Sequence, residues 1–280
     1  MIVDRSRLPT VIVVGVQKCG TTSLHHYLRR HPQVAMSRQK ELDFFIEARN
    51  WPRGVEWYAR HFDPSARARG ESSPNYTALR RYPGVAERMR RVVPDVRVVF
   101  MVRDPIERLI SHWVHNYAHG SEHRPLHAVL DDDLYLERSR YAMQLRPYLD
   151  AFPRGSILIL ETGELRRRRR EVMPGVFEFI GVDPAFWSER YQRELHRSGP
   201  KRRKTALGLR IFESRLGAWV DRRQEPWRAI AGRLLYLPFS RRIPRPRLGD
   251  DERRQLADRL RPDIDEFRTL TQLAFDRWSV

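Results

Sequence analysis

The segment that most constrains the fold lies near the amino terminus, where an apolar run leads into a glycine-containing loop and then a helical pattern. Residues 10–16 (TVIVVGV) form a β-branched run that is typical of a buried parallel strand. The loop GVQKCGTT covers residues 15–22, and Leu24, Tyr27 and Leu28 follow at helical spacing. The sequence therefore predicts a strand, a loop and a helix within its first thirty residues.

Two more apolar runs predict further strands, at residues 96–102 (VRVVFMV) and 156–160 (SILIL). Helical stretches are predicted between and around them, at about 51–62, 84–92, 104–116, 139–152 and 171–181. Strands that alternate with helices indicate an α/β fold with a parallel sheet and right-handed crossovers. In such a sheet we expect ligands beyond the carboxyl ends of the strands.

The chain is interpreted as a single domain over residues 1–280, because no internal repeat or flexible linker interrupts it. Its core covers about residues 8–195. From about 196 to 280 the sequence is basic, contains prolines and is mainly helical in pattern, so we interpret it as an extension of the same domain. Residues 196–254 alone hold 17 basic and 6 acidic residues, a net charge of +11.

The charge and cysteine content exclude several classes of protein. The formal net charge is +18, and 49 of the 53 basic residues are arginines, which favours an anionic partner or an arginine-rich surface. A hydrophobic content of 41% excludes a wholly disordered chain. The single cysteine, Cys19, excludes an intrachain disulfide and a zinc site built on cysteines. The apolar run near the start is too short to span a bilayer, so we expect no transmembrane segment and a cytoplasmic location.

The first motif is the loop itself. Backbone N–H groups of such a loop, with a helix N-terminus behind them, form a cradle for an anion. The pattern matches a Walker A loop at both glycines and then departs from it, because Thr21 stands where the lysine belongs and Lys18 lies inside the loop. An ordinary turn between a strand and a helix is the alternative interpretation.

The second motif is RDPIERLIS, at residues 103–111. Arg103 ends the predicted strand, Asp104 and Pro105 suit the start of a helix, and Ser111 follows about two turns later. An arginine and a serine placed in this way can bind one phosphate through charge-assisted hydrogen bonds. The alternative is a helix cap followed by an unrelated exposed serine.

Together these motifs resemble those of sulfotransferases that use 3′-phosphoadenylyl sulfate (PAPS), most closely the heparan sulfate sulfotransferase-like branch and its bacterial relatives. The resemblance implies a P-loop-like three-layer sandwich and a 5′-phosphosulfate-binding loop. It implies that Arg103 and Ser111 bind the 3′-phosphate. It also implies PAPS as the sulfuryl donor, adenosine 3′,5′-bisphosphate as the product, and no metal. The loop residues that it assigns to cofactor binding are Lys18, Cys19, Gly20, Thr21 and Thr22.

The resemblance also implies a catalytic base. The segment KELDFF at residues 40–45 is similar to the pattern K-E-x-x-F-F, in which the glutamate takes the proton of the acceptor, so Glu41 is the matching residue. Phe44 and Phe45 are expected to bury this carboxylate. A surface carboxylate paired with Lys40 is the alternative. The rival bases are Asp43, His25, His26 and His31.

A basic stretch at 198–204 (SGPKRRK) falls where relatives place residues that close over the 3′-phosphate. Lys201, Arg202 and Arg203 are therefore candidates for cofactor binding, and a flexible basic loop is the alternative. The segment GESSPNY at 70–76 resembles another family segment, except that Ser72 replaces a frequent lysine. The acceptor is expected to be a hydroxyl or amine of a carbohydrate, a glycolipid or a small metabolite.

Two other functions compete with this interpretation. A P-loop nucleotide kinase needs a metal ligand at a strand end, and Asp104 is the nearby candidate. A nucleic-acid-binding protein could use the basic carboxyl-terminal region, although no recognised nucleic-acid motif is present, so we expect no nucleic-acid partner. The sequence does not indicate an oligomeric state.

Overall fold

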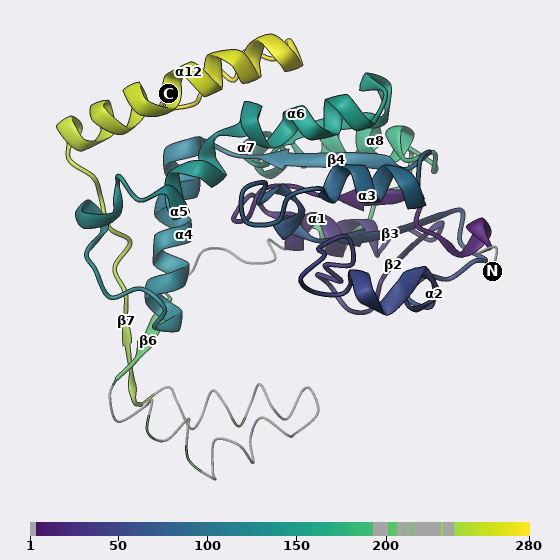
Figure 1. Ribbon diagram of the computed structural model, residues 1–280, viewed down its shortest axis with the longest axis horizontal. Coiled ribbons are helices and arrows are strands. Elements are labelled where there is room, and N and C mark those ends of the chain that lie inside the picture. Colours follow the sequence, from purple (N-terminus) through teal and green to yellow (C-terminus); the bar gives the residue numbers. More distant parts are fainter. Residues whose placement is uncertain (1–3, 193–200, 206–209, 211–213, 215–230, 232–237) are drawn as a thin grey trace.

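Five short strands form one parallel sheet in the order β2-β3-β1-β4-β5. Figure 1 labels β2, β3 and β4 of this sheet. The computed structural model describes residues 4–192, 201–205, 210, 214, 231 and 238–280. The strands are β1 (Val11–Val13), β2 (Val34–Met36), β3 (Ala68–Ser72), β4 (Arg97–Val102) and β5 (Ile157–Glu161). The parallel sheet confirms the predicted fold class.

The three strands predicted from apolar runs are β1, β4 and β5, and each is slightly shorter than its run. The pattern did not reveal β2 and β3. Strand β3 reads ARGES, with no apolar alternation, yet it lies between β2 and β1 and its last three residues are buried. Its burial comes from its place in the sheet, and hydrogen bonding to two neighbours satisfies its backbone.

Helices occupy every interval in which the sequence predicted one. Helix α1 (Thr21–Leu28) follows the first loop and ends before Pro32, and α4 (Pro105–His119) begins after Asp104, whose carboxylate accepts from the N–H of Glu107 at 2.8 Å. The others are α2 (Gly54–Ala59), α3 (Val85–Val92), α5 (Asp133–Leu136), α6 (Tyr141–Ala151), α7 (Thr162–Arg167) and α8 (Arg169–Phe179). Short 3₁₀ turns include η3 (Pro74–Thr77) and η5 (Glu137–Ser139).

Helices cover both faces of the sheet. Phe100 of β4 lies against Tyr148 of α6 and Phe267 of α12 (Asp250–Thr271), with ring centroids 6.1 and 6.4 Å apart. The next residue, Met101, points to the opposite face, where it contacts the loop that leads into α1. On that side His31, just after α1, packs against Phe177 of α8 at 4.7 Å. The result is the predicted three-layer sandwich.

The described carboxyl-terminal part packs onto this core. Strands β6 (Arg202–Lys204) and β7 (Ser240–Arg242) form an antiparallel hairpin beside α4, and α12 runs along α6 (Figure 1). The carboxylate of Asp263 in α12 accepts from the N–H groups of Ala142 and Met143, both at 3.0 Å, and so caps α6. Much of the predicted helical extension between 206 and 237 lies outside the described residues.

Within the described residues, no helix is both long enough and apolar enough to cross a membrane.

Candidate functional site

The loop after β1 lies directly on strand β4. The N–H of Val14 donates to Val99 O and that of Val16 to Met101 O, both at 3.0 Å, so the loop continues the ladder of β1. A Cβ on Gly15 would lie 2.3 Å from Met101 Cβ. The first glycine of the motif therefore allows a close approach that no other residue permits.

The far end of the loop carries hydrogen-bond donors that the helix itself does not use. Lys18 and Gly20 both have left-handed backbone, with φ of 75° and 79°. Gly20 precedes α1 and caps it with no side chain, so the first N–H groups of the helix, those of Thr21 and Thr22, have no intrahelical acceptor. These N–H groups and the two threonine hydroxyls form the donor set that an anionic oxygen needs.

Cys19 does not belong to this donor set. Its N–H donates to Val16 O at 3.0 Å, and its thiol is fully buried beside Tyr141. Burial raises the pKa of the Cys19 thiol to about 11, which keeps it neutral. The turn that shapes the loop already uses the N–H of Cys19, and a contact between Cys19 and the cofactor stays a prediction.

Positive charge gathers around Lys18. Burial first, and then the charges of Lys201 and Arg103, lower the pKa of Lys18 to about 8. Lys201 Nζ lies 3.0 Å from His115 Nδ1. Burial, followed by Lys18 and Lys201, lowers the pKa of His115 to about 3, so this imidazole is neutral. Three cationic side chains from distant parts of the chain thus converge beside the loop, which is the arrangement of an anion site.

Arg103 lies just before α4 begins, and Ser111 lies about two turns into that helix. Arg103 lies within electrostatic reach of Lys18, and its Nη2 is 3.6 Å from Glu107 Oε2. Ser111 is half-buried, and it shares a helix face with His115 four residues later. The structure thus brings the two sequence motifs to the same edge of the sheet, as predicted for one ligand that bridges them.

The basic stretch divides into two faces because it forms a strand. Lys201 faces His115, and Arg203 faces the same helix, with its guanidinium 4.2 Å from the ring of Tyr117. Arg202 points the other way, and its Nε donates to Ser240 Oγ at 2.8 Å across the hairpin. Arg202 therefore bonds within the hairpin, and a contact between Arg202 and the cofactor stays a prediction. Residues 198–200 of this stretch lie outside the described residues.

Glu41 lies in an exposed position at the edge of the same site. Its side chain is 47% exposed, its backbone is left-handed (φ 65°), and Oε1 lies 2.6 Å from Lys40 Nζ. The expectation that Phe44 and Phe45 bury this carboxylate is wrong. Both rings are fully buried and pack in the core, where Phe44 stacks on Tyr58 at 4.3 Å. Lys18 feels the negative charge of Glu41, so the two groups face one site.

The buried carboxylate of this region is Glu71 of β3, which the sequence analysis did not single out. It accepts from three hydroxyls, those of Tyr58 (2.7 Å), Tyr76 (2.8 Å) and Ser73 (2.6 Å). Two of these hydroxyls in turn accept from the loop that carries Glu41: Ser73 from the N–H of Asp43 at 3.1 Å, and Tyr76 from that of Phe45 at 3.4 Å. Glu71 therefore holds the loop of the candidate base.

The rival bases have other partners. Asp43 is buried and forms an ion pair with Arg49, although burial still raises the pKa of the Asp43 carboxyl. His25 Nδ1 lies 3.1 Å from Ser72 Oγ, and burial lowers the pKa of His25 to about 4. His31 Nε2 lies 3.0 Å from Asp183 O. These side chains hold the fold together, so Glu41 is the exposed carboxylate that faces Lys18.

The described residues contain no group of three or more side chains placed to hold a metal ion. Asp104, the metal ligand that a kinase would need, caps α4 and also accepts from the N–H and hydroxyl of Ser279, at 2.6 and 2.7 Å. Its carboxylate is therefore committed to structure.

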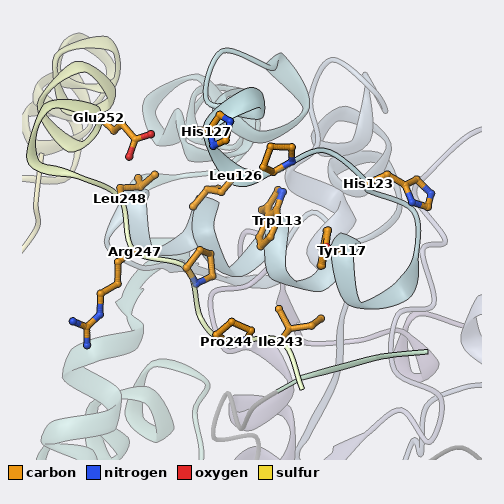
Figure 2. A pocket seen from close by; sticks show the side chains of 12 residues that line it. Trp113, Tyr117, His123, Leu126, His127, Ile243, Pro244, Arg247, Leu248 and Glu252 are labelled. Carbon is orange, nitrogen blue, oxygen red and sulfur yellow. The ribbon is translucent and has the colours of Figure 1, made fainter. Parts of the chain in front are cut away.

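A cavity of about 480 Å³ lies beside α4, and its lining includes none of Lys18, Arg103 and Lys201. Figure 2 shows Trp113 and Tyr117 of α4 facing the segment with Ile243 and Pro244 across it. At 100° per residue, Trp113 and Tyr117 lie on the opposite side of the helix from Ser111 and His115. This cavity therefore lies outside the site of the two motifs.

Comparison with known proteins gives one consistent family. A model described as "Sulfotransferase domain" matches residues 8–204. The membrane-associated sulfotransferase kil1 of Dictyostelium discoideum is 35% identical over 111 residues, which are 38% of this chain and 22% of that protein. The human bifunctional heparan sulfate N-deacetylase/N-sulfotransferase 2 is 27% identical over 201 residues, or 64% of this chain and 22% of the relative. The chain thus spans about a fifth of the length of these relatives.

Solved structures give the same fold. A sulfotransferase from Alicyclobacillus acidocaldarius has a TM-score of 0.68 at 22% identity and covers 97% of this chain and 99% of its own. The sulfotransferase domain from the curacin biosynthetic pathway has a TM-score of 0.51 at 12% identity, with 91% and 98% covered. These likenesses confirm the predicted architecture.

Proposed function

Because the chain belongs to the sulfotransferase domain family, we propose that it transfers a sulfuryl group from PAPS to a hydroxyl or amine of a carbohydrate, glycolipid or small metabolite. The observation that carries this proposal is the convergence of Lys18, Arg103 and Lys201 beside the start of α1, whose first N–H groups have no intrahelical acceptor. A donor with phosphate groups at two positions fits two motifs that meet at one edge. The cytoplasmic location stays a prediction.

Different residues are proposed to bind different parts of PAPS. We assign the 5′-phosphosulfate to the N–H groups of Gly20, Thr21 and Thr22 and to the threonine hydroxyls, since a helix N-terminus favours an anion there. Arg103 and Ser111 hold the 3′-phosphate. Arg203 packs on Tyr117, on the other side of α4 from Ser111, so its contact with the cofactor stays a prediction. Lys201 acts on Lys18 more strongly than Arg103 does, so we place it beside the sulfuryl group.

The proposed reaction is a single in-line displacement. The acceptor oxygen or nitrogen forms a bond to sulfur while its proton passes to the Glu41 carboxylate. The bond between sulfur and the bridging oxygen breaks, and its electron pair remains on the 5′-phosphate of adenosine 3′,5′-bisphosphate. Lys18 stabilises the charge that develops on that oxygen. Fixed cations supply the stabilisation, so the proposal includes no metal.

The test is a thermal-shift titration with adenosine 3′,5′-bisphosphate, AMP and ATP. At about 100 times its Kd, the bisphosphate is expected to raise the Tm by about 5–10 °C, because a ligand that binds only the folded state stabilises it. AMP and ATP lack the 3′-phosphate and should give much smaller shifts. The double variant Arg103→Ala, Ser111→Ala should abolish that difference. Equal shifts for all three nucleotides would contradict the proposal.

A further inference from the structure

A buried arginine near this site has no partner. Arg138 of η5 is only 7% exposed, and its Nη1 is completely buried without a hydrogen bond. Within the described part of the chain, no hydrogen bond or ion pair reaches its guanidinium. An uncompensated buried charge is costly, and most buried polar groups in folded proteins are satisfied. The unpaired guanidinium therefore points to a ligand that would accept its hydrogen bonds.

A neighbouring arginine shows what a purely structural role looks like. Arg108 is fully buried, but its guanidinium donates to Ser139 Oγ at 2.7 Å and to Tyr135 O at 2.6 Å, and lies 3.4 Å from His112 Nδ1. These partners orient Arg108 in the fold. Arg138 belongs to the same turn as Ser139 and has none of them, so packing alone does not account for its charge.

The charges around Arg138 leave it positive and uncompensated. Burial first, and then the charges of Arg108 and Arg81, lower the pKa of Arg138 to about 10. Arg81 is exposed, and its guanidinium lies 5.5 Å from the centre of the Tyr82 ring. The negative charge of Glu137 offsets part of this repulsion. Arg138 thus lies within electrostatic reach of two other arginines, a setting that an added anion would stabilise.

Two chains of contacts connect this arginine to the candidate reaction centre. On one side, His112 lies within electrostatic reach of both Arg138 and Lys18. On the other, Tyr82 accepts from Arg49 at 2.8 Å, and Arg49 forms an ion pair with Asp43, whose carboxyl feels the charge of Glu41. Tyr82 also lies within electrostatic reach of Arg138, so neighbouring charges connect Arg138 with both the candidate base and the candidate lysine.

We propose that Arg138 binds an anionic group of the acceptor, a carboxylate or a sulfate ester, and so helps to select the substrate. This inference rests on the function proposed above. A planar guanidinium matches the oxygens of either group through paired hydrogen bonds. Of the two buried arginines in the described residues, Arg138 alone lacks a partner, so the site takes one such group.

The test uses the full chain saturated with adenosine 3′,5′-bisphosphate, so that the phosphate-binding groups are already occupied. Sodium glucuronate, glucose 6-sulfate and glucose are then titrated at constant ionic strength. The two anionic sugars are expected to raise the Tm further, by about 2–4 °C at ten times their Kd, and glucose is not. The anionic sugar that gives the larger shift identifies the preferred group.

Two variants complete the experiment. Arg138→Met is expected to keep the shift with the bisphosphate, to lose the shift with the anionic sugars, and to have a Tm no lower than wild type, because an unpaired buried charge is removed. Arg91→Met removes an exposed arginine of α3 and should behave as wild type.

The possible outcomes separate the two proposals. Equal shifts with anionic and neutral sugars, or an anionic shift that survives in Arg138→Met, would overturn the assignment of Arg138. If Arg138→Met does not fold, the wild-type titration still decides, because it compares matched sugars. Failure of the bisphosphate itself to shift the Tm would instead refute the sulfotransferase proposal.

Discussion

At the scale of single residues, the unusual property of the site is that its lysine loses affinity for its own proton before any ligand arrives. Burial and two neighbouring cations lower the pKa of Lys18 to about 8. An anion that binds beside Lys18 favours the charged form, so binding of the anion and binding of the proton support each other. The repulsion between Lys18 and its neighbouring cations therefore favours binding of an anion at the candidate site.

This linkage predicts that the affinity for adenosine 3′,5′-bisphosphate falls as the pH rises above 8. Below pH 8 Lys18 is already protonated, whereas above it binding must also recruit a proton, which costs about tenfold in Kd per pH unit. The phosphate groups are fully ionised throughout this range. Calorimetric titrations from pH 7 to 9.5 measure the effect. Lys18→Arg, which stays charged, should flatten the profile, and an unchanged slope in that variant would contradict the assignment.

At the scale of elements, the site depends on how two loops are fixed to the sheet. The first loop packs closely on β4 at Gly15. The loop of Glu41 donates hydrogen bonds to hydroxyls that Glu71 holds in place. Neither contact involves the reacting atoms. Both decide where Lys18 and Glu41 lie, and displacements on the order of 1 Å can cost a factor of about 10² in rate.

Gly15→Ala is expected to destabilise the fold, because the new Cβ would lie 2.3 Å from Met101 Cβ and 2.7 Å from Met101 N. Overpacking of this kind costs about 1–3 kcal/mol, so the Tm should fall by about 2 °C or more. Gly155→Ala is the matched control, since no atom lies within 4 Å of the position of its Cβ. Thermal unfolding of both variants measures the difference, and equal Tm values would contradict the close approach.

Glu71→Gln is expected to lower kcat by about 10²-fold while the Kd for adenosine 3′,5′-bisphosphate stays unchanged. The amide must donate a proton where the carboxylate accepted one, so at least one hydroxyl loses the acceptor that orients it. Where that hydroxyl belongs to Ser73 or Tyr76, the loop N–H that bonds to it is displaced. Tyr58→Phe is the control, because the Tyr58 hydroxyl contacts Glu71 and not the loop. An equal loss of kcat in both variants would show a general loss of stability rather than positioning.

The sequence predicted those parts of the fold and site that local patterns encode. The strand–loop–helix units around Lys18 and Arg103 were clear because apolar runs, caps and glycines act over a few residues. Strand β3 was missed, since its burial depends on neighbours that lie far away in the sequence. The exposure of Glu41 was mispredicted because the adjacent phenylalanines turn into the core. His115 was missed, although its spacing of four residues from Ser111 on α4 was a usable signal.

At the scale of the whole molecule, the basic residues behind the formal charge of +18 serve two purposes: some stabilise the fold, and others gather at the candidate site. Many arginines bind carbonyl oxygens or carboxylates of their own chain, as Arg69 does with Leu8 O and Ala66 O. The hairpin of β6 and β7 instead brings Lys201 from late in the chain to the first loop. The cation cluster therefore exists only when the carboxyl-terminal part is docked on α4.

This docking predicts a coupled change in Lys201→Ala. Removing Lys201 removes one of the charges that depress the pKa of Lys18, so the midpoint of the pH dependence should move above 8. The affinity for adenosine 3′,5′-bisphosphate at pH 7 should also fall, because one cation is lost. Arg202→Ala is the matched control on the opposite face of β6 and should leave the midpoint in place. A midpoint that stays at about 8 without Lys201 would contradict the docked arrangement.

The left-handed backbone at Lys18 has a consequence for how such a chain evolves. A lysine in this conformation costs about 1–2 kcal/mol that a glycine would not, so Lys18→Gly relieves both the backbone and the crowded charge. Selection for thermostability alone would therefore favour loss of this side chain. Under the proposed mechanism only turnover requires the lysine, so a chain with glycine at this position is expected to fold at least as well and to transfer sulfuryl groups poorly.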